Sequence, residues 1–206
     1  MHQTRIVVLI SGNGSNLQAL IDAEQRGELN GGHIVAVFSN RADAHGLERA
    51  RKAGIPAEVL SHKDFPERAH YDTALMQHID AYKPDLVVLA GFMRILTPAF
   101  VHHYAGKLIN IHPSLLPKYP GMNTHARAIE AGETEHGATV HFVTEGVDEG
   151  PVILQGRVPV LPDDTSETLQ QRVHAIEHKI YPEAVRRLCV ARQKGEHSQP
   201  ASVHRD

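Results

Sequence analysis

The chain has 206 residues, of which 41% are hydrophobic and 22% charged, a composition typical of globular proteins. Its formal net charge of −3 leaves no basic excess for binding nucleic acid, and no polybasic run points to a membrane surface. No apolar stretch reaches the roughly 18 residues that span a membrane. The single Cys189 cannot form an internal disulfide, which favours a reducing compartment. We therefore expect a cytoplasmic protein without nucleic-acid or membrane partners.

Short apolar runs alternate with amphipathic segments over the first half of the chain. A run that is apolar throughout, such as residues 5–10, is typical of a strand buried on both faces of a sheet. The pattern predicts strands at 5–10, 33–39, 57–60, 86–89 and 107–112, with helices between them at 15–24, 46–53, 67–81 and 97–104. Such β-α-β alternation predicts a parallel, doubly wound sheet with Rossmann-like topology.

The pattern changes after Pro113, where a Pro/Gly-rich loop covers residues 113–124. Loops of this length in compact domains tend to be functional. Beyond it the sequence predicts a helix at 126–131, strands at 137–143 and 152–160, and a long helix at 166–192 that is interrupted or bent near Pro182. We expect a single domain over 1–193, with an N-terminal half of about 1–105 and a C-terminal half of about 106–193. Residues 194–206 are expected to form a flexible tail.

A Gly-rich turn, Ser11-Gly12-Asn13-Gly14-Ser15-Asn16, joins the first predicted strand to the first helix. Such a turn lets backbone N–H groups approach a phosphate at a helix N-terminus; alternatively, it is a tight turn in which Ser15 is the helix N-cap. A dinucleotide fingerprint would need a glycine in place of Leu17, and no acidic residue ends the second strand. A single phosphate group fits best, although Asn40 and Arg41 leave an NADP phosphate as a weaker alternative.

The segment His174-Ala175-Ile176-Glu177-His178 matches the H-x-x-E-H pattern of inverted zinc proteases. Two histidines at i and i+4 share a helix face, as zinc ligation requires. Histidine is abundant in this chain, however, and a third ligand would have to come from elsewhere. We favour a solvated helix face for His178 and expect no metal site.

Asn110 and His112 lie at the end of a predicted central strand, where an open parallel sheet binds its ligands. Their i, i+2 spacing points both side chains to one face. An amide and an imidazole there can stabilise a developing oxyanion; equally, His112 can cap the strand while Asn110 bonds the loop backbone. The Pro-rich loop that follows is stiff enough to form a pocket wall. Asp148 lies in an acidic turn that could return to the site and orient the imidazole.

Four segments, taken together, resemble a known family. They are Gly12-Asn13-Gly14-Ser15-Asn16, Leu89-Ala90-Gly91-Phe92-Met93-Arg94-Ile95-Leu96, the run from Asn110 to Gly121, and Val147-Asp148-Glu149-Gly150-Pro151-Val152. In order and spacing, from about residue 5 to about residue 192, the chain is similar to the phosphoribosylglycinamide formyltransferase family of purine biosynthesis. The Asn-x-His and Ser-Leu-Leu-Pro core is shared with other 10-formyltetrahydrofolate enzymes and identifies only the superfamily.

The resemblance implies the formyltransferase fold, a Rossmann-like, doubly wound, mainly parallel sheet with an antiparallel C-terminal extension. It implies a one-carbon transferase that uses 10-formyltetrahydrofolate as co-substrate and glycinamide ribonucleotide as acceptor, without a metal. The catalytic residues would be Asn110, His112 and Asp148. The ribonucleotide phosphate would be held by Gly14, Ser15 and Asn16, with Glu177 near the ribose. His174 departs from the family, whose close relatives carry Gln there.

The resemblance also implies a folate site. Met93, Arg94, Ile95 and Leu96 would border the pterin, with Asn110 beside it and residues 144–148 on the other side. Arg68 would lie near the glutamate tail of the folate. Cys189 is expected to be structural, and the protein to be a monomer or a homodimer.

Four other interpretations remain. A formyltetrahydrofolate deformylase shares the Asn-x-His…Asp set but usually carries an N-terminal regulatory domain, for which we see no room before Arg5. A methionyl-tRNA formyltransferase would add a basic C-terminal domain. An NADP oxidoreductase rests only on the first turn, and a phosphate-binding module leaves Asn110, His112 and Asp148 unexplained.

Overall fold

The structure is a computed structural model that describes residues 3–195. Its centre is one seven-stranded sheet in the order β3-β2-β1-β4-β5-β6-β7. The strands are β1 (Thr4–Ile10), β2 (Gly32–Ser39), β3 (Ala57–Val59), β4 (Leu86–Leu89), β5 (Leu108–His112), β6 (Glu135–Phe142) and β7 (Val152–Pro159). The first five are parallel, whereas β6 and β7 join antiparallel beside β5. The mainly parallel sheet and its antiparallel extension are thus confirmed.

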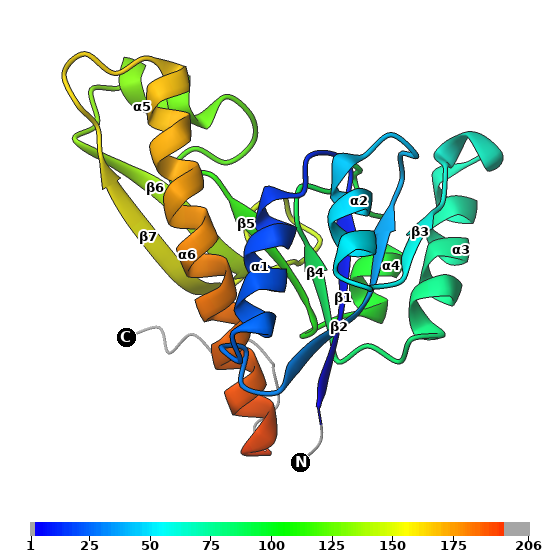
Figure 1. Ribbon diagram of the computed structural model, residues 1–206. Helices are drawn as coiled ribbons and strands as arrows, with labels where there is room; N and C mark the ends of the chain where they lie inside the picture. Colours follow the sequence, from blue (N-terminus) through cyan, green and yellow to red (C-terminus); the bar gives the residue numbers. More distant parts are fainter. Residues whose placement is uncertain (1–2, 196–206) are drawn as a thin grey trace.

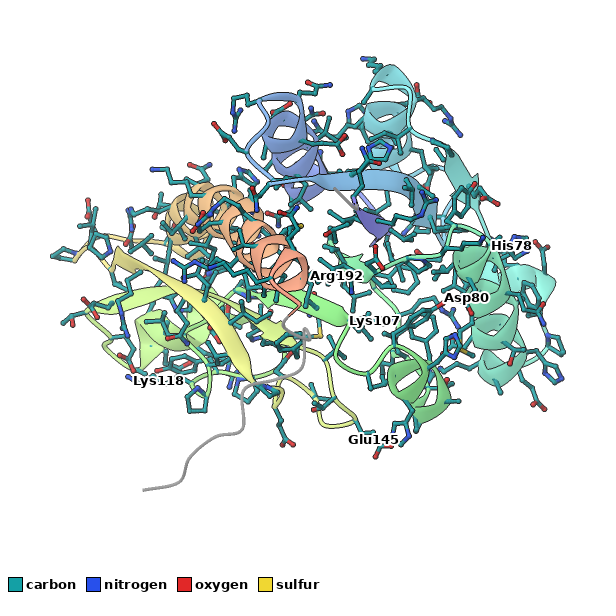
Figure 2. All side chains as sticks on the ribbon, turned by 90° about the horizontal axis from the view of Figure 1, so that it is seen from below. His78, Asp80, Lys107, Lys118, Glu145 and Arg192 are labelled. Carbon is teal, nitrogen blue, oxygen red and sulfur yellow. The ribbon has the colours of Figure 1, made fainter. Side chains whose placement is uncertain are left out.

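Helices cover both faces of the sheet (Figure 1). They are α1 (Ser15–Gln25), α2 (His45–Lys52), α3 (Arg68–Asp80), α4 (Pro98–His103), α5 (Thr124–Glu130) and α6 (Ser166–Gln193), with a short 3-10 helix at His62–Asp64. One hydrophobic core lies under α1, α2 and α6, and a second lies under α3 and α4. Seen from below, α3, which carries His78 and Asp80, lies apart from α6, which ends near Arg192 (Figure 2). No helix among residues 3–195 is long and apolar enough to cross a membrane.

The central strand β1 explains why its sequence is apolar throughout. Ile6, Val8 and Ile10 pack into the first core, and Val7 and Leu9 pack into the second. Each of these side chains is at most 1% exposed. Alternating residues of a strand point to opposite faces, so a strand covered on both faces needs apolar residues at every position.

Some element boundaries differ from the prediction. α5 begins at Thr124 and β6 at Glu135, each two residues earlier than the sequence pattern indicates. The early start of α5 follows Asn123, whose left-handed backbone (φ 57°) ends the loop. The sequence does not indicate the 3-10 helix. The sequence predicts a helix that is interrupted or bent near Pro182; the interruption is wrong, because α6 continues through Pro182 while packing against α1, β6 and β7, and the bend stays a prediction.

The chain beyond α6 is predicted to be a flexible tail. Of the predicted flexible tail, Lys194 and Gly195 form a turn after α6, and residues 196–206 lie outside the described residues.

The strand order β3-β2-β1-β4-β5 contains a switch point between β1 and β4. The chain runs outward from β1 to β2 and β3, and then returns to add β4 and β5 on the other side of β1. Ligands of open α/β sheets bind at such a switch point, outside the carboxyl ends of the strands.

Candidate active site

The Gly-rich turn follows β1 at the switch point. Gly14 has φ 77° and is the N-cap of α1, without a side-chain cap. The alternative that Ser15 is the N-cap is therefore wrong, because Ser15 is already the first helical residue. A Cβ at position 14 would lie 2.6 Å from the Cα of Gly46, so only glycine fits this close approach. The uncapped N–H groups of the first turn of α1 are left available for an anion.

Side chains from two neighbouring elements hold this turn in place. Arg49 of α2 donates from Nε to the Asn13 carbonyl and from Nη2 to Asn13 Oδ1, both at 2.8 Å. The hydroxyl of Ser11 donates to Asn40 Oδ1 at 2.5 Å and accepts from the Met93 N–H at 2.8 Å. The turn is thereby tied to α2 on one side and to the segment after β4 on the other. Sequence reasoning missed Arg49, since it belongs to no motif.

The same contacts weaken the NADP alternative. Asn40 is 7% exposed and is engaged by Ser11. The guanidinium of Arg41 is paired through two hydrogen bonds of 3.0 Å with Asp43. Both side chains thus already have partners within the protein, which makes them less suited to the 2′-phosphate of a dinucleotide.

A cavity of about 490 Å³ opens beside the turn. Its volume lies in the range of small-molecule sites in proteins. It is lined by the turn at 12–16, the segment at 90–93, and Asn110, Ile111, Pro113, His125, Gln170, His174 and Glu177. The cavity therefore joins the predicted phosphate site to the end of β5.

Glu177 of α6 faces the turn across 161 residues of sequence. Its Oε1 accepts from Asn16 Nδ2 at 3.1 Å, while Oε2 is buried without a partner among the described residues. Burial raises the pKa of Glu177, and the Asn16 hydrogen bond opposes that shift. His174 Nε2 lies 4.0 Å from Glu177 Oε2. The structure thus brings the predicted ribose-side residue to the predicted phosphate turn.

The zinc-protease pattern lies on the same helix. The rings of His174 and His178 are stacked with centroids 6.5 Å apart. Among residues 3–195 no group of three or more His, Cys, Asp or Glu side chains is arranged to hold a metal ion. The acidic member of the pattern, Glu177, faces Asn16.

Asn110 and His112 occupy the end of β5 as predicted, but they have different surroundings. Asn110 lines the cavity, whereas His112 does not line it and is 6% exposed. His112 Nε2 lies 2.9 Å from the Tyr119 carbonyl, and Nδ1 lies 3.4 Å from Asp148 Oδ2. Both ring nitrogens therefore face oxygen acceptors, one from the loop after β5 and one from the turn between β6 and β7.

Asp148 reaches His112 through the acidic turn, as the sequence predicts. Its Oδ2 also accepts from the Gly121 N–H at 2.9 Å, so the carboxylate bridges the two loops. Asp148 (φ 53°) and Tyr119 (φ 52°) both adopt the left-handed conformation that non-glycine residues seldom adopt. Strained residues of this kind cluster at functional sites.

The loop after β5 is anchored to the antiparallel extension. Thr139 Oγ1 donates to the Ser114 carbonyl at 2.7 Å and accepts from the Leu116 N–H at 3.1 Å. Gln155 Nε2 donates to the Leu116 carbonyl at 2.8 Å. These contacts fix the first residues of the loop. They were not predicted, because hydroxyl and amide groups that bond remote backbone leave no sequence signature.

A histidine pair lies beside the cavity. His125 Nδ1 lies 3.1 Å from His136 Nε2. Burial, followed by the neighbouring His136, lowers the pKa of His125 to about 4. Burial likewise lowers the pKa of His136. Both rings are therefore neutral near pH 7.

The expected folate segments border different cavities. A largely apolar cavity of about 520 Å³ is lined by Val101, His102, Ala105, Gly106 and the segment at 142–146. Glu145, labelled in Figure 2, forms an ion pair with His102 across it. Met93, in contrast, lines the cavity at the switch point. The prediction that residues 93–96 and 144–148 enclose one folate stays a prediction.

The segment after β4 packs on the start of α3. The Arg94 guanidinium lies 4.1 Å from the ring centroid of Tyr71, and the Thr97 N–H donates to Asp72 Oδ2 at 2.8 Å. Arg68 is exposed in the first turn of the same helix. Met93 and Ile95 are 76% and 69% exposed, an unusual degree for apolar side chains and a surface that suits an apolar ligand.

Comparison with known proteins gives the family. Residues 4–185 match the formyl transferase family. The chain is 61% identical to phosphoribosylglycinamide formyltransferase of Escherichia coli (strain K12), over 86% of this chain and 83% of that protein. It is 54% identical to trifunctional purine biosynthetic protein adenosine-3 of Drosophila melanogaster, over 89% of this chain but only 14% of that protein.

Solved structures agree with this result. The phosphoribosylglycinamide formyltransferase of Coxiella burnetii, solved in complex with CHES, has a TM-score of 0.88 and 56% sequence identity. The alignment covers 93% of this chain and 89% of that chain. Sequence and fold therefore lead to one conclusion, that the chain belongs to the formyl transferase family.

Proposed function

We propose that this protein transfers the formyl group of 10-formyltetrahydrofolate to the glycyl amine of N1-(5-phospho-D-ribosyl)glycinamide, a step of purine biosynthesis. The observation that carries the proposal is the cavity at the switch point. It is lined both by a turn suited to one phosphate and by Asn110. The close relatedness to phosphoribosylglycinamide formyltransferase of Escherichia coli supports the same substrates.

The ribonucleotide would lie along the cavity. Its phosphate would bind the N–H groups of Gly14, Ser15 and Asn16, where the dipole of α1 favours an anion. The free Oε2 of Glu177 would accept from a ribose hydroxyl, which would give this buried oxygen a partner. This orientation directs the glycyl amine toward Asn110.

The chemistry requires an attack on the formyl carbon. The glycyl nitrogen forms a bond to that carbon and gives a tetrahedral intermediate with a negatively charged oxygen. The side-chain NH₂ of Asn110 would donate a hydrogen bond to this oxygen. The bond between the carbon and N10 then breaks, and the proton lost by the glycyl nitrogen is delivered to N10, which yields tetrahydrofolate and the formylated product.

His112 and Asp148 would serve the proton transfer. The carboxylate of Asp148 faces His112 Nδ1 and holds the ring in one orientation. His112 Nε2 faces the Tyr119 carbonyl in this structure. For Nε2 to act on the intermediate, directly or through water, the ring must exchange this carbonyl for the reacting group. No step needs a covalent enzyme intermediate, and Cys189 is buried away from the site.

The folate would bind beside Met93, Arg94, Ile95 and Leu96, with residues 144–148 opposite and Arg68 near its glutamate tail. The exposed Met93 and Ile95 support this assignment, because a ring system would cover them. We also place the reaction in the cytoplasm, in a monomer or homodimer, which cell fractionation and light scattering would test.

One assay tests the function. The purified protein is mixed with a 10-formyl folate, with and without glycinamide ribonucleotide, and release of the deformylated folate is followed. Release only with the ribonucleotide is the expected result. Release without it would indicate a deformylase, and no release in either case would overturn both functions. The Asn110→Ala variant provides the control for enzyme-dependent release.

A further inference from the structure

Arg127 of α5 holds the tip of the loop that follows β5. Its Nη1 donates to the Pro120 carbonyl at 2.6 Å and to the Met122 carbonyl at 3.1 Å. Its guanidinium carbon lies 5.3 Å from the ring centroid of Tyr119, within the range of a cation–π contact. One side chain therefore contacts three residues of the segment at 119–122.

Two residues of the same segment contact His112 and Asp148, the pair proposed to serve the proton transfer. The Tyr119 carbonyl faces His112 Nε2, and the Gly121 N–H donates to Asp148. Arg127 bonds the carbonyls of residues 120 and 122, whereas His112 and Asp148 contact residues 119 and 121. The two sets of contacts therefore alternate along the chain. A shift of this segment would move both the acceptor of His112 and the donor of Asp148.

Apart from Arg127 and the segment's contacts with His112 and Asp148, its exposed part has little packing to hold it. Pro120, Gly121 and Met122 are exposed, and Met122 is 77% exposed. The bonds from Lys118 and Tyr119 to Glu133 fix only the beginning of this stretch. Exposed backbone that packs against no core keeps its conformation through hydrogen bonds, so a guanidinium that bonds two carbonyls has a large influence here.

We propose that Arg127 is a positioning residue, which sets the geometry of His112 and Asp148 through the backbone of residues 119–122. This inference rests on the proposed function, because it assigns Arg127 to the same reaction. Arg127 does not line the cavity at the switch point, so its effect should reach the reaction without changing ribonucleotide binding.

The test is Arg127→Ala, which keeps a residue favourable for helix α5. We expect kcat to fall by about 10- to 100-fold, because a misplacement of about 1 Å at a reacting group has effects of this size. KM for glycinamide ribonucleotide should stay within about twofold, since the phosphate turn is untouched. Arg127→Lys should recover only part of the loss, because an ammonium lacks the planar fork. Millimolar guanidinium should restore part of kcat in Arg127→Ala and none in Arg127→Lys.

Glu130→Ala provides the matched control. Glu130 is exposed on the same helix, one turn away from Arg127. It should keep wild-type kcat, KM and thermal midpoint, which separates loss of the Arg127 contacts from a general effect on α5.

A second readout does not depend on turnover. The ¹⁵N signals of the His112 ring, assigned with a His112→Asn variant, should move in Arg127→Ala and stay unchanged in Glu130→Ala. Wild-type kcat in Arg127→Ala, or a lower kcat with unmoved His112 signals, would overturn the inference. If the wild-type protein transfers no formyl group, the proposed function fails, while the His112 signals still decide whether Arg127 positions that ring.

Discussion

Two parts of the site are built in different ways: the proposed phosphate end at the Gly-rich turn, and the proposed reacting end at Asn110, His112 and Asp148. The phosphate end rests on β1 and β4 in the middle of the parallel sheet, and its turn is held by α2 through Arg49 and the close approach of Gly46. At the proposed reacting end, Asn110 lines the cavity from β5, and His112 follows two residues later on the same strand without lining it. Their partners come from two loops in which Tyr119 and Asp148 have left-handed backbones.

This difference separates binding from chemistry. The phosphate end offers backbone N–H groups whose positions are set by the fold, as a site for an unchanging group requires. The reacting end depends on side chains that bond exposed backbone, such as Asp148 on the Gly121 N–H. Bonds of this kind can exchange partners during a reaction. Substitutions at one end should therefore change binding and stability, and substitutions at the other should change turnover.

The largest effect is expected at the reacting end. Asn110→Ala removes the amide that faces the cavity and should lower kcat by about 10² to 10³, the usual cost of one oxyanion donor. KM for the ribonucleotide should change little, because the phosphate turn is intact. Steady-state kinetics with both substrates measure the two constants, and circular dichroism should show an unchanged fold.

Asp148→Asn tests a second residue of the reacting end. It keeps an oxygen for the Gly121 N–H but removes the charge that faces His112. It should fold normally and also transfer formyl groups far more slowly. Near-normal turnover of both purified variants would remove the proposed catalytic roles.

The next effect is expected at the phosphate end. Gly14→Ala places a Cβ within 2.6 Å of the Gly46 backbone, at a φ of 77° that alanine adopts with strain. We expect a loss of about 1–3 kcal/mol in the free energy of unfolding, the usual cost of one such residue. KM for the ribonucleotide should rise more than kcat falls, because the displaced N–H groups are those proposed to bind the phosphate. Urea unfolding and kinetics provide the measurements.

Gly12→Ala is the matched stability control in the same turn. A Cβ there would meet no atom within 4 Å, and Gly12 has no left-handed backbone. Its free energy of unfolding should stay near that of the wild type. Equal destabilisation by both variants would contradict the view that the turn is set by its packing on α2.

The sequence predicts local features of the site better than contacts between distant segments, for a physical reason. The continuous apolar run of β1 and the glycines after it depend on local periodicity and local backbone freedom. The meeting of Asn16 with Glu177, 161 residues away, could not be derived from periodicity and came from a family resemblance. The boundary of α5 was missed because the left-handed Asn123 ends the loop, and asparagine is only one of several residues that can do so.

Supporting residues were missed at both ends. Arg49 and Thr139 each bond a carbonyl of a remote loop, and Arg127 bonds a carbonyl of the loop that precedes its own helix. A backbone carbonyl is present at every position, so the sequence contains nothing that marks which ones will be bonded. Asp148 could be expected near His112 because an acidic turn carries it, but its second contact, with Gly121, depends on the path of both loops.

The smallest effect concerns pH and the histidine pair, His125 and His136, beside the cavity. The folded state holds the pKa of His125 at about 4, whereas an unfolded histidine has a pKa of about 6.5. Between these values the unfolded chain binds a proton that the folded protein does not, so stability falls as pH decreases from about 6.5 to about 4. Thermal midpoints at pH 7.5, 6 and 5 should therefore decrease, and His125→Gln should show a shallower decrease. The dependence of the thermal midpoint on pH will persist in part, because burial also lowers the pKa of His136, His141 and His178.

His70→Gln, at an exposed position of α3, is the control and should keep the full wild-type dependence of the thermal midpoint on pH. An equal dependence in wild type and His125→Gln would show that the histidine pair does not couple folding to pH.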